Sequence, residues 1–121
     1  EILGKPRSID DAKQLLTKLS GQTHEVLTSV AVGYWDANGQ WLSLQRVSRS
    51  QVRFSSLSAR QIDRYVATEE PFGKAGGYGI QGVAALFIDC INGSYSGIMG
   101  LPAYETSQLL EAVGVELVVS P

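Results

Sequence analysis

The sequence predicts an α/β fold in which a mixed β-sheet is flanked by helices. Stretches with helical spacing of apolar residues alternate along the chain with stretches that are rich in Val, Thr and aromatic residues. The first two strand-like stretches are separated only by a short turn, so they are expected to be antiparallel neighbours in that sheet. The length of 121 residues, with 44% hydrophobic and 18% charged residues, predicts a single soluble domain over residues 1–121.

The first elements are expected to be a helix and a long hairpin. Ser8 precedes an apolar stripe at helical spacing, and Gly21 follows it as a stop signal. The stripe consists of Ile9, Ala12, Leu15, Leu16 and Leu19. Residues 23–35 and 40–54 both have strand composition, and the turn signal Asp36-Ala37-Asn38-Gly39 joins them.

A second helix and a third strand are expected next. Ser58 and Gln61 match the S-x-x-Q capping box that begins many helices, and three apolar residues follow on one face: Ile62, Tyr65 and Val66. Residues 83–91 form the most apolar run, which predicts a buried strand. Cys90 lies at the end of this run and is expected to be a buried core residue.

The last part of the chain predicts a tight turn, a third helix and a short strand. Asn92-Gly93 is the turn signal, and Pro102 is placed to begin a helix that Gly114 ends. Residues 115–119 have the composition of a closing strand.

Composition excludes several classes of function. The formal net charge is −2 and no block of Lys and Arg occurs, so no nucleic acid polymer is expected as a partner. No apolar run reaches the length of a membrane span. Cys90 is the only cysteine, so an internal disulfide is impossible and a reducing compartment fits.

The segment Gly73-Lys74-Ala75-Gly76-Gly77-Tyr78-Gly79-Ile80-Gln81-Gly82, called here the glycine cluster, is the strongest functional signal. Its five glycines are suited to a sharp turn or to close approach by a ligand. Lys74 supplies a positive charge for phosphate, and the Gln81 amide can both donate to and accept from a nucleobase. Lys74 is followed by Ala75, so the segment is not a P-loop. On this pattern alone, a phosphate site and a purely structural turn remain equally open.

The common catalytic arrangements are not evident in the sequence. His24 is the only histidine and has no nearby Cys or Asp with which to form a zinc site or a triad. The neighbouring carboxylates Glu69 and Glu70 precede Pro71, a pattern more typical of a solvated turn than of a metal site. No metal-ligating residue is therefore assigned, and no catalytic residue can be named.

Six ordered motifs closely resemble the Maf family of nucleoside triphosphate pyrophosphatases. They are Gly4-Lys5-Pro6, Leu19-Ser20-Gly21-Gln22-Thr23-His24, Tyr65-Val66, residues 74–82, Asn92-Gly93-Ser94-Tyr95-Ser96, and Gly100-Leu101-Pro102 with Glu105-Thr106. The resemblance spans essentially the whole chain and implies the C-terminal portion of a Maf/ITPase-like fold. It also implies a cytoplasmic enzyme that cleaves between the α and β phosphates with a divalent cation, Mg²⁺ or Mn²⁺. A homodimer is a separate expectation, because missing N-terminal strands would leave apolar surface and a sheet edge open.

The resemblance implies roles for three residues as substrate-binding groups. Lys5 matches the lysine of the family's Gly-Lys-Pro turn and Lys74 that of its Lys-Ala-Gly segment, both expected near the triphosphate. Gln81 matches the position tied to base selection, and Gln there resembles the subfamily acting on dTTP and UTP. Gly73 stands where the family usually has Asp, which is expected to loosen the site if that carboxylate orients the lysine.

The family's N-terminal motifs, Ser-Pro-Arg-Arg and Gly-Ala-Asp-Thr, do not occur in this sequence. The aspartate of the second motif is the family's proposed general base, so the base is expected outside this chain, and the N-terminal segment is expected to be missing. Three hypotheses follow: a dTTP/UTP pyrophosphatase whose catalytic half lies elsewhere, a nucleotide-binding module without turnover, and a dimerisation fragment.

Overall fold

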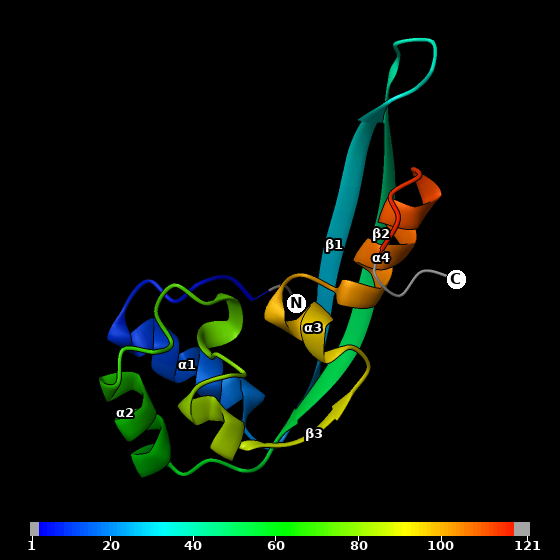
Figure 1. Ribbon diagram of the computed structural model, residues 1–121. Coiled ribbons are helices and arrows are strands. Elements are labelled where there is room, and N and C mark those ends of the chain that lie inside the picture. The colour runs from blue at the N-terminus through cyan, green and yellow to red at the C-terminus, as the bar shows by residue number, and fades with distance from the viewer. Residues whose placement is uncertain (1–2, 118–121) are drawn as a thin grey trace. The chain divides into compact units, whose positions relative to one another are not determined.

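The computed structural model describes residues 3–117, which form helices and one three-stranded sheet (Figure 1). The elements in chain order are α1 (Ile9–Leu19), β1 (Thr23–Trp35), β2 (Trp41–Phe54), α2 (Ala59–Ala67), the 3₁₀ turns η1 (Ala75–Gly77) and η2 (Val83–Leu86), β3 (Ile88–Asn92), α3 (Tyr95–Met99) and α4 (Ala103–Ala112). The α/β fold class is confirmed. The strands lie in the order β1-β2-β3, with β1 and β2 as the predicted hairpin and β3 antiparallel to β2, so the described strands all pair antiparallel.

The described residues divide into two compact units. One contains residues 3–25 and 51–92, and the other contains residues 26–50 and 93–117. The glycine cluster and all three predicted substrate-binding residues fall in the first unit. That unit therefore carries the candidate site.

The core of the first unit forms where α1 packs against α2. The apolar stripe predicted for α1 is buried at Ala12, Leu15, Leu16 and Leu19, whereas Ile9 is exposed. From α2 come Ile62, Tyr65 and Val66, and β2 adds Val52 and Phe54. Each fully buried Leu, Ile, Val or Phe side chain stabilises the fold by about 1.5–3 kcal/mol, which fixes α1 and α2 as the support for the segments around them.

Both predicted helix starts are confirmed at the level of individual atoms. Ser8 Oγ accepts a hydrogen bond from the Asp11 amide at 3.1 Å at the start of α1. At α2 the capping box is complete, because Ser58 Oγ accepts from the Gln61 amide at 3.1 Å and Gln61 Oε1 accepts from the Ser58 amide at 2.8 Å. These bonds satisfy amides that the first turn of a helix leaves unpaired.

The prediction of one buried strand over residues 83–91 is wrong in its first half, and its second half is a strand but is mostly exposed. Residues 83–86 form the turn η2, and the strand β3 begins only at Ile88. Cys90 is exposed, so its prediction as a core residue is also wrong. An apolar run cannot by itself distinguish a strand from a turn. In β3, residues 89–92 are all exposed although they alternate between the two faces, so the apolar composition does not reflect burial.

In the second unit, two helices follow β3 along the chain. The short helix α3 was not predicted, because its five residues are too few to show the helical spacing of apolar residues. Its first turn is capped by Ser94 Oγ, which accepts a hydrogen bond from the Gly97 amide at 2.9 Å. Thr28 Oγ1 donates to the Gly97 carbonyl at 2.6 Å, which joins α3 to the hairpin within this unit. The third predicted helix is confirmed as α4, which starts directly after Pro102.

The predicted closing strand over residues 115–119 is not found in its described part. Residues 115–117 have no regular structure, and residues 118 and 119 lie outside the described residues. Within residues 3–117, no helix combines the length and the apolar character needed to cross a membrane.

Candidate functional site

The glycine cluster is a tight loop that connects the end of α2 to η2 (Figure 1). Gly76 and Gly77 have φ angles of 79° and 81°, so two consecutive residues adopt the left-handed conformation. That conformation costs an L-residue with a side chain about 1–2 kcal/mol, whereas glycine adopts it freely. The glycines are therefore required by the turn itself, whatever the loop binds.

A backbone hydrogen bond ties this loop to the Gly-Lys-Pro turn near the start of the chain. The Gly76 amide donates to the Gly4 carbonyl at 3.0 Å. Pro6 is buried, and its Cγ lies 3.7 Å from the position that a Cβ on Gly77 would take. Lys5 and Lys74, predicted from separate motifs, are thus carried by two segments that are bonded to each other, and both side chains are exposed.

The side chain of Lys74 runs along the backbone of Gly79. A Cβ built on Gly79 would stand 2.8 Å from Lys74 Cε, which is closer than carbon atoms pack. Glycine at position 79 therefore leaves room for the Lys74 stem. Gln81, two residues further on, is exposed. The structure thus places all three predicted substrate-binding residues on adjoining segments of one unit, each open to solvent.

Several amides of the glycine cluster are used within the protein. The amides of Lys74, Gly76, Gly77 and Gly82 donate to backbone carbonyls, and the Gly79 amide donates to the Tyr65 hydroxyl at 3.3 Å. These five groups are unavailable as a cradle for phosphate. A bound phosphate would therefore depend mainly on the lysine ammonium groups, which are mobile point charges.

Tyr78, at the centre of the cluster, anchors the loop to β1. Its hydroxyl lies 2.6 Å from His24 Nε2, and its ring packs edge-on against His24 and Phe54. Burial lowers the pKa of His24, and burial raises the pKa of Tyr78 to about 12, so both groups are neutral near pH 7. His24 supports the loop through this contact.

Glu70 is the residue whose role the sequence did not indicate. Its Oε1 accepts from the Val83 amide at 3.0 Å and its Oε2 from the Ala84 amide at 3.3 Å. The predicted turn is found at Glu69 and Glu70, and Glu69 is exposed, but Glu70 is half-buried and its carboxylate is bonded to the protein instead of being left to solvent. The only sequence signal was a carboxylate placed just before the glycine-rich segment, and nothing in the spacing showed which amides it would reach.

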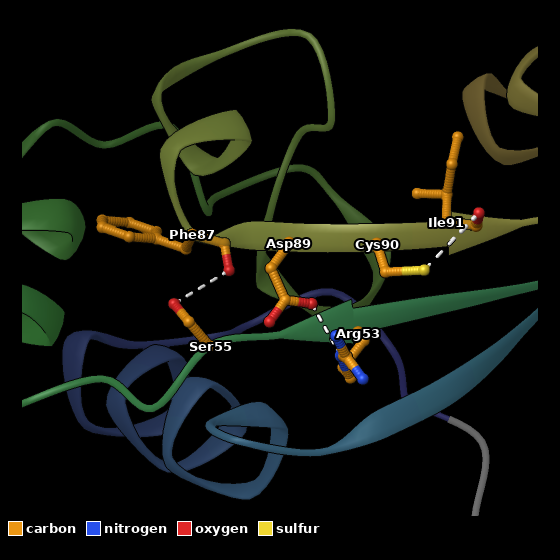
Figure 2. A network of polar contacts seen from close by, with 6 residues as sticks. All are labelled: Arg53, Ser55, Phe87, Asp89, Cys90 and Ile91. Carbon is orange, nitrogen blue, oxygen red and sulfur yellow. Dashed lines mark hydrogen bonds and ion pairs between the residues drawn. The ribbon is translucent and has the colours of Figure 1, made fainter.

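The strand that follows η2 is held by the polar contacts drawn in Figure 2. Arg53 Nε donates to Asp89 Oδ1 at 2.7 Å, and Ser55 Oγ donates to the Phe87 carbonyl at 3.1 Å. The Asp89 carboxylate raises the pKa of Arg53. The first contact joins β2 to β3, and the second joins the residues next to these strands. Together they hold the segment that follows η2 against β2.

The structure also contains a groove that is separate from the predicted site residues. A groove of about 510 Å³ is lined by Ser8, Ile9, Lys13, Asp63, Val66, Ala67, Glu69 and Phe72, and none of these is a predicted site residue. Among residues 3–117, no three His, Cys, Asp or Glu side chains converge as they would around a metal ion.

Comparison with known proteins identifies the relatives of this chain. The family model described as Maf-like protein matches residues 1–113. A protein of Burkholderia lata named dTTP/UTP pyrophosphatase is 56% identical over 114 residues, which cover 94% of this chain and 53% of the relative. Proteins with the same name from Aromatoleum aromaticum and Chromobacterium violaceum are 54% and 50% identical over 117 residues, covering 97% of this chain and 54% and 57% of each relative. The chain thus spans about half the length of the curated relatives it matches.

Proposed function

The chain belongs to the Maf family, and from this premise we propose that the protein is a nucleoside triphosphate pyrophosphatase acting on dTTP and UTP. It would release the nucleoside monophosphate and pyrophosphate. The printed names of the relatives support the substrate class. The structural observation that carries the proposal is the hydrogen bond from the Gly76 amide to the Gly4 carbonyl, because it joins the segments that bear Lys5 and Lys74.

The two lysines would act on the triphosphate. Cleavage between the α and β phosphates leaves negative charge on the departing pyrophosphate, and preorganised cations lower the barrier by stabilising that charge. Lys5 and Lys74 are both exposed and lie on segments joined by the Gly76–Gly4 hydrogen bond, which supports a shared role at one polyanion. In this step the two lysines supply only positive charge. The attacking water must therefore be activated by another group.

Gln81 would select the base. Thymine and uracil present an N–H flanked by carbonyl groups, and a primary amide can accept from the first and donate to a second. An ionised Glu at this position could only accept. Gln81 is exposed and follows the Gly79 backbone along which Lys74 lies, so phosphate and base contacts would come from one loop.

No metal ligand is assigned among residues 3–117. No cluster of three potential ligands occurs within residues 3–117. Mg²⁺ in nucleotide-cleaving enzymes is commonly held by substrate phosphates and by one or two carboxylates. A divalent cation remains part of the proposal through the family, and it would be bound mainly by the triphosphate itself and by residues outside this part of the chain.

A second candidate is a nucleotide-binding module without turnover. It is favoured by one observation: no Gly-Ala-Asp-Thr motif, which carries the family's general base, occurs in the 121 residues. A homodimer in the cytoplasm is a further expectation. It is supported by the exposed Leu27, Trp35, Trp41 and Val47 on the hairpin, and sedimentation of the purified protein would test it.

Pyrophosphate release from dTTP, UTP and a methylated guanine triphosphate, with Mg²⁺ or Mn²⁺ present, tests the proposal. The chain should be assayed beside a version extended upstream to the length of its relatives. Turnover of dTTP and UTP by the extended version alone supports the pyrophosphatase with its base elsewhere. Turnover by this chain alone would place the base among its own carboxylates, with Glu69, Glu70 and Glu105 to be replaced first. Binding without turnover in both versions would favour the module.

A further inference from the structure

We propose that Glu70 is a positioning residue that sets the place of Gln81, and with it the selectivity of the site for pyrimidine nucleotides. The inference rests on the proposed function, because it assigns the role of Gln81 to base recognition. Glu70 itself is not expected to touch the substrate. It acts on the backbone that follows Gln81.

The first step is the geometry of the carboxylate. Both oxygens of Glu70 are engaged, Oε1 by the Val83 amide at 3.0 Å and Oε2 by the Ala84 amide at 3.3 Å. An ionised carboxylate accepting backbone N–H groups makes stronger hydrogen bonds than a neutral acceptor. These two hydrogen bonds hold the backbone two and three residues beyond Gln81.

The second step is the absence of a side chain at Gly82. A Cβ built on Gly82 would collide with Glu70 Oε1. The residue between Gln81 and the two clamped amides must therefore be glycine if the carboxylate is to keep its place. Glycine at position 82 and Glu at position 70 form one interdependent pair.

The third step is the other end of the same segment. The Gly79 amide donates to the Tyr65 hydroxyl at 3.3 Å, and Tyr65 lies on the buried face of α2. Burial raises the pKa of Tyr65, and the nearby Glu70 carboxylate raises it further, so the hydroxyl stays neutral. Residues 80–82 are thus held on one side through Tyr65 and on the other through Glu70, with the exposed Gln81 between these two anchors.

The test uses the protein extended to the length of its relatives, as wild type and as Glu70→Gln. Gln keeps one acceptor oxygen but turns an NH₂ group toward the second amide, so one hydrogen bond is lost. We expect kcat/KM for dTTP and UTP to fall about tenfold, mainly through KM, as expected for loss of one charge-assisted hydrogen bond. Inhibition by inorganic triphosphate, which has no base, should change less than about twofold.

Matched variants keep the inference falsifiable. Glu116→Gln removes the same charge from an exposed glutamate of the second unit and should match wild type. Gly82→Ala should lower kcat/KM for dTTP about as much as Glu70→Gln does. The double variant should lose less activity than the two single losses combined, because both changes disturb the same contact. If Glu70→Gln weakens dTTP and inorganic triphosphate equally, or changes neither, the positioning role is wrong.

Failure of the role of Glu70 can be distinguished from failure of the proposed function. If the wild-type protein turns over no nucleotide, the pyrophosphatase proposal fails, and calorimetric binding of dTTP and inorganic triphosphate then decides the role of Glu70. A loss confined to dTTP in Glu70→Gln would support the inference even then. Equal binding of dTTP by wild type and Glu70→Gln would overturn it.

Discussion

The Gly76 amide donates a 3.0 Å hydrogen bond to the Gly4 carbonyl, joining the two lysine-bearing segments of the first unit. Neither glycine has a side chain, so the contact depends entirely on the path of the backbone. It brings Gly-Lys-Pro and the glycine cluster, which are distant in sequence, next to each other, as the proposed nucleotide site requires.

Replacing either lysine should damage catalysis. In the extended protein, Lys5→Ala and Lys74→Ala should each lower kcat/KM for dTTP by about 100-fold, because a cation aimed at the leaving group is lost. Steady-state pyrophosphate release measures this. Lys13→Ala is the control, since Lys13 forms a surface ion pair with Asp63 at 3.1 Å and should leave activity within about twofold, as exposed pairs contribute little. Full activity in both site variants would remove the lysines from the site.

Gln81→Glu should shift the preference among bases away from dTTP and UTP. The carboxylate would face a thymine or uracil carbonyl without a proton to donate, so we expect kcat/KM for dTTP and UTP to fall at least about tenfold. Activity on a methylated guanine triphosphate should fall less or rise. The ratio of the two kcat/KM values is the measurement, and an unchanged ratio would show that Gln81 does not read the base.

Gly77→Ala should destabilise the protein although space for a methyl group exists. The nearest atoms to a Cβ at this position are 3.7–3.8 Å away, which is ordinary contact, but the φ angle of 81° is unfavourable for alanine. We expect the free energy of unfolding to fall by about 1–2 kcal/mol. Gly4→Ala is the matched control, because a Cβ there meets nothing within 4 Å and should change stability by less than about 0.5 kcal/mol. Chemical denaturation of both variants provides the comparison.

Acidification should destabilise the fold through His24. Its pKa is lowered by burial, so below its ordinary value of 6.5 the unfolded chain takes up a proton that the folded protein resists. Stability contributed by the neutral ring is present above pH 6.5 and is lost as the pH falls toward the lowered folded-state value. His24→Gln, which can still hydrogen-bond the Tyr78 hydroxyl, should show a smaller loss of unfolding free energy between pH 7 and 5. Identical pH profiles for the two proteins would exclude this contribution.

Local patterns in the sequence were sufficient for most of the regular structure. Ser8, Ser58 and Gln61 begin helices because the required partners are only three residues away. The hairpin follows from strand composition on both sides of a turn signal. The errors have two causes. The late start of β3 and the exposure of Cys90 depend on how the chain packs, which an apolar run does not encode. The helix α3 has a local cap at Ser94, but its five residues are too few to give a helical pattern.

In the candidate site, too, the sequence indicates individual residues, whereas the folded structure decides which of them meet. The sequence by itself determined which residues carry the charge and the amide, Lys5, Lys74 and Gln81, because motif and chemistry are readable one segment at a time. Only the tertiary structure decided that Gly4 meets Gly76, that Lys74 runs along Gly79, and that Glu70 reaches the amides beyond Gln81. Those contacts depend on how the loop is folded onto the packed α1 and α2. A hydrogen bond between distant segments depends on the path of the whole intervening chain, which no local pattern encodes.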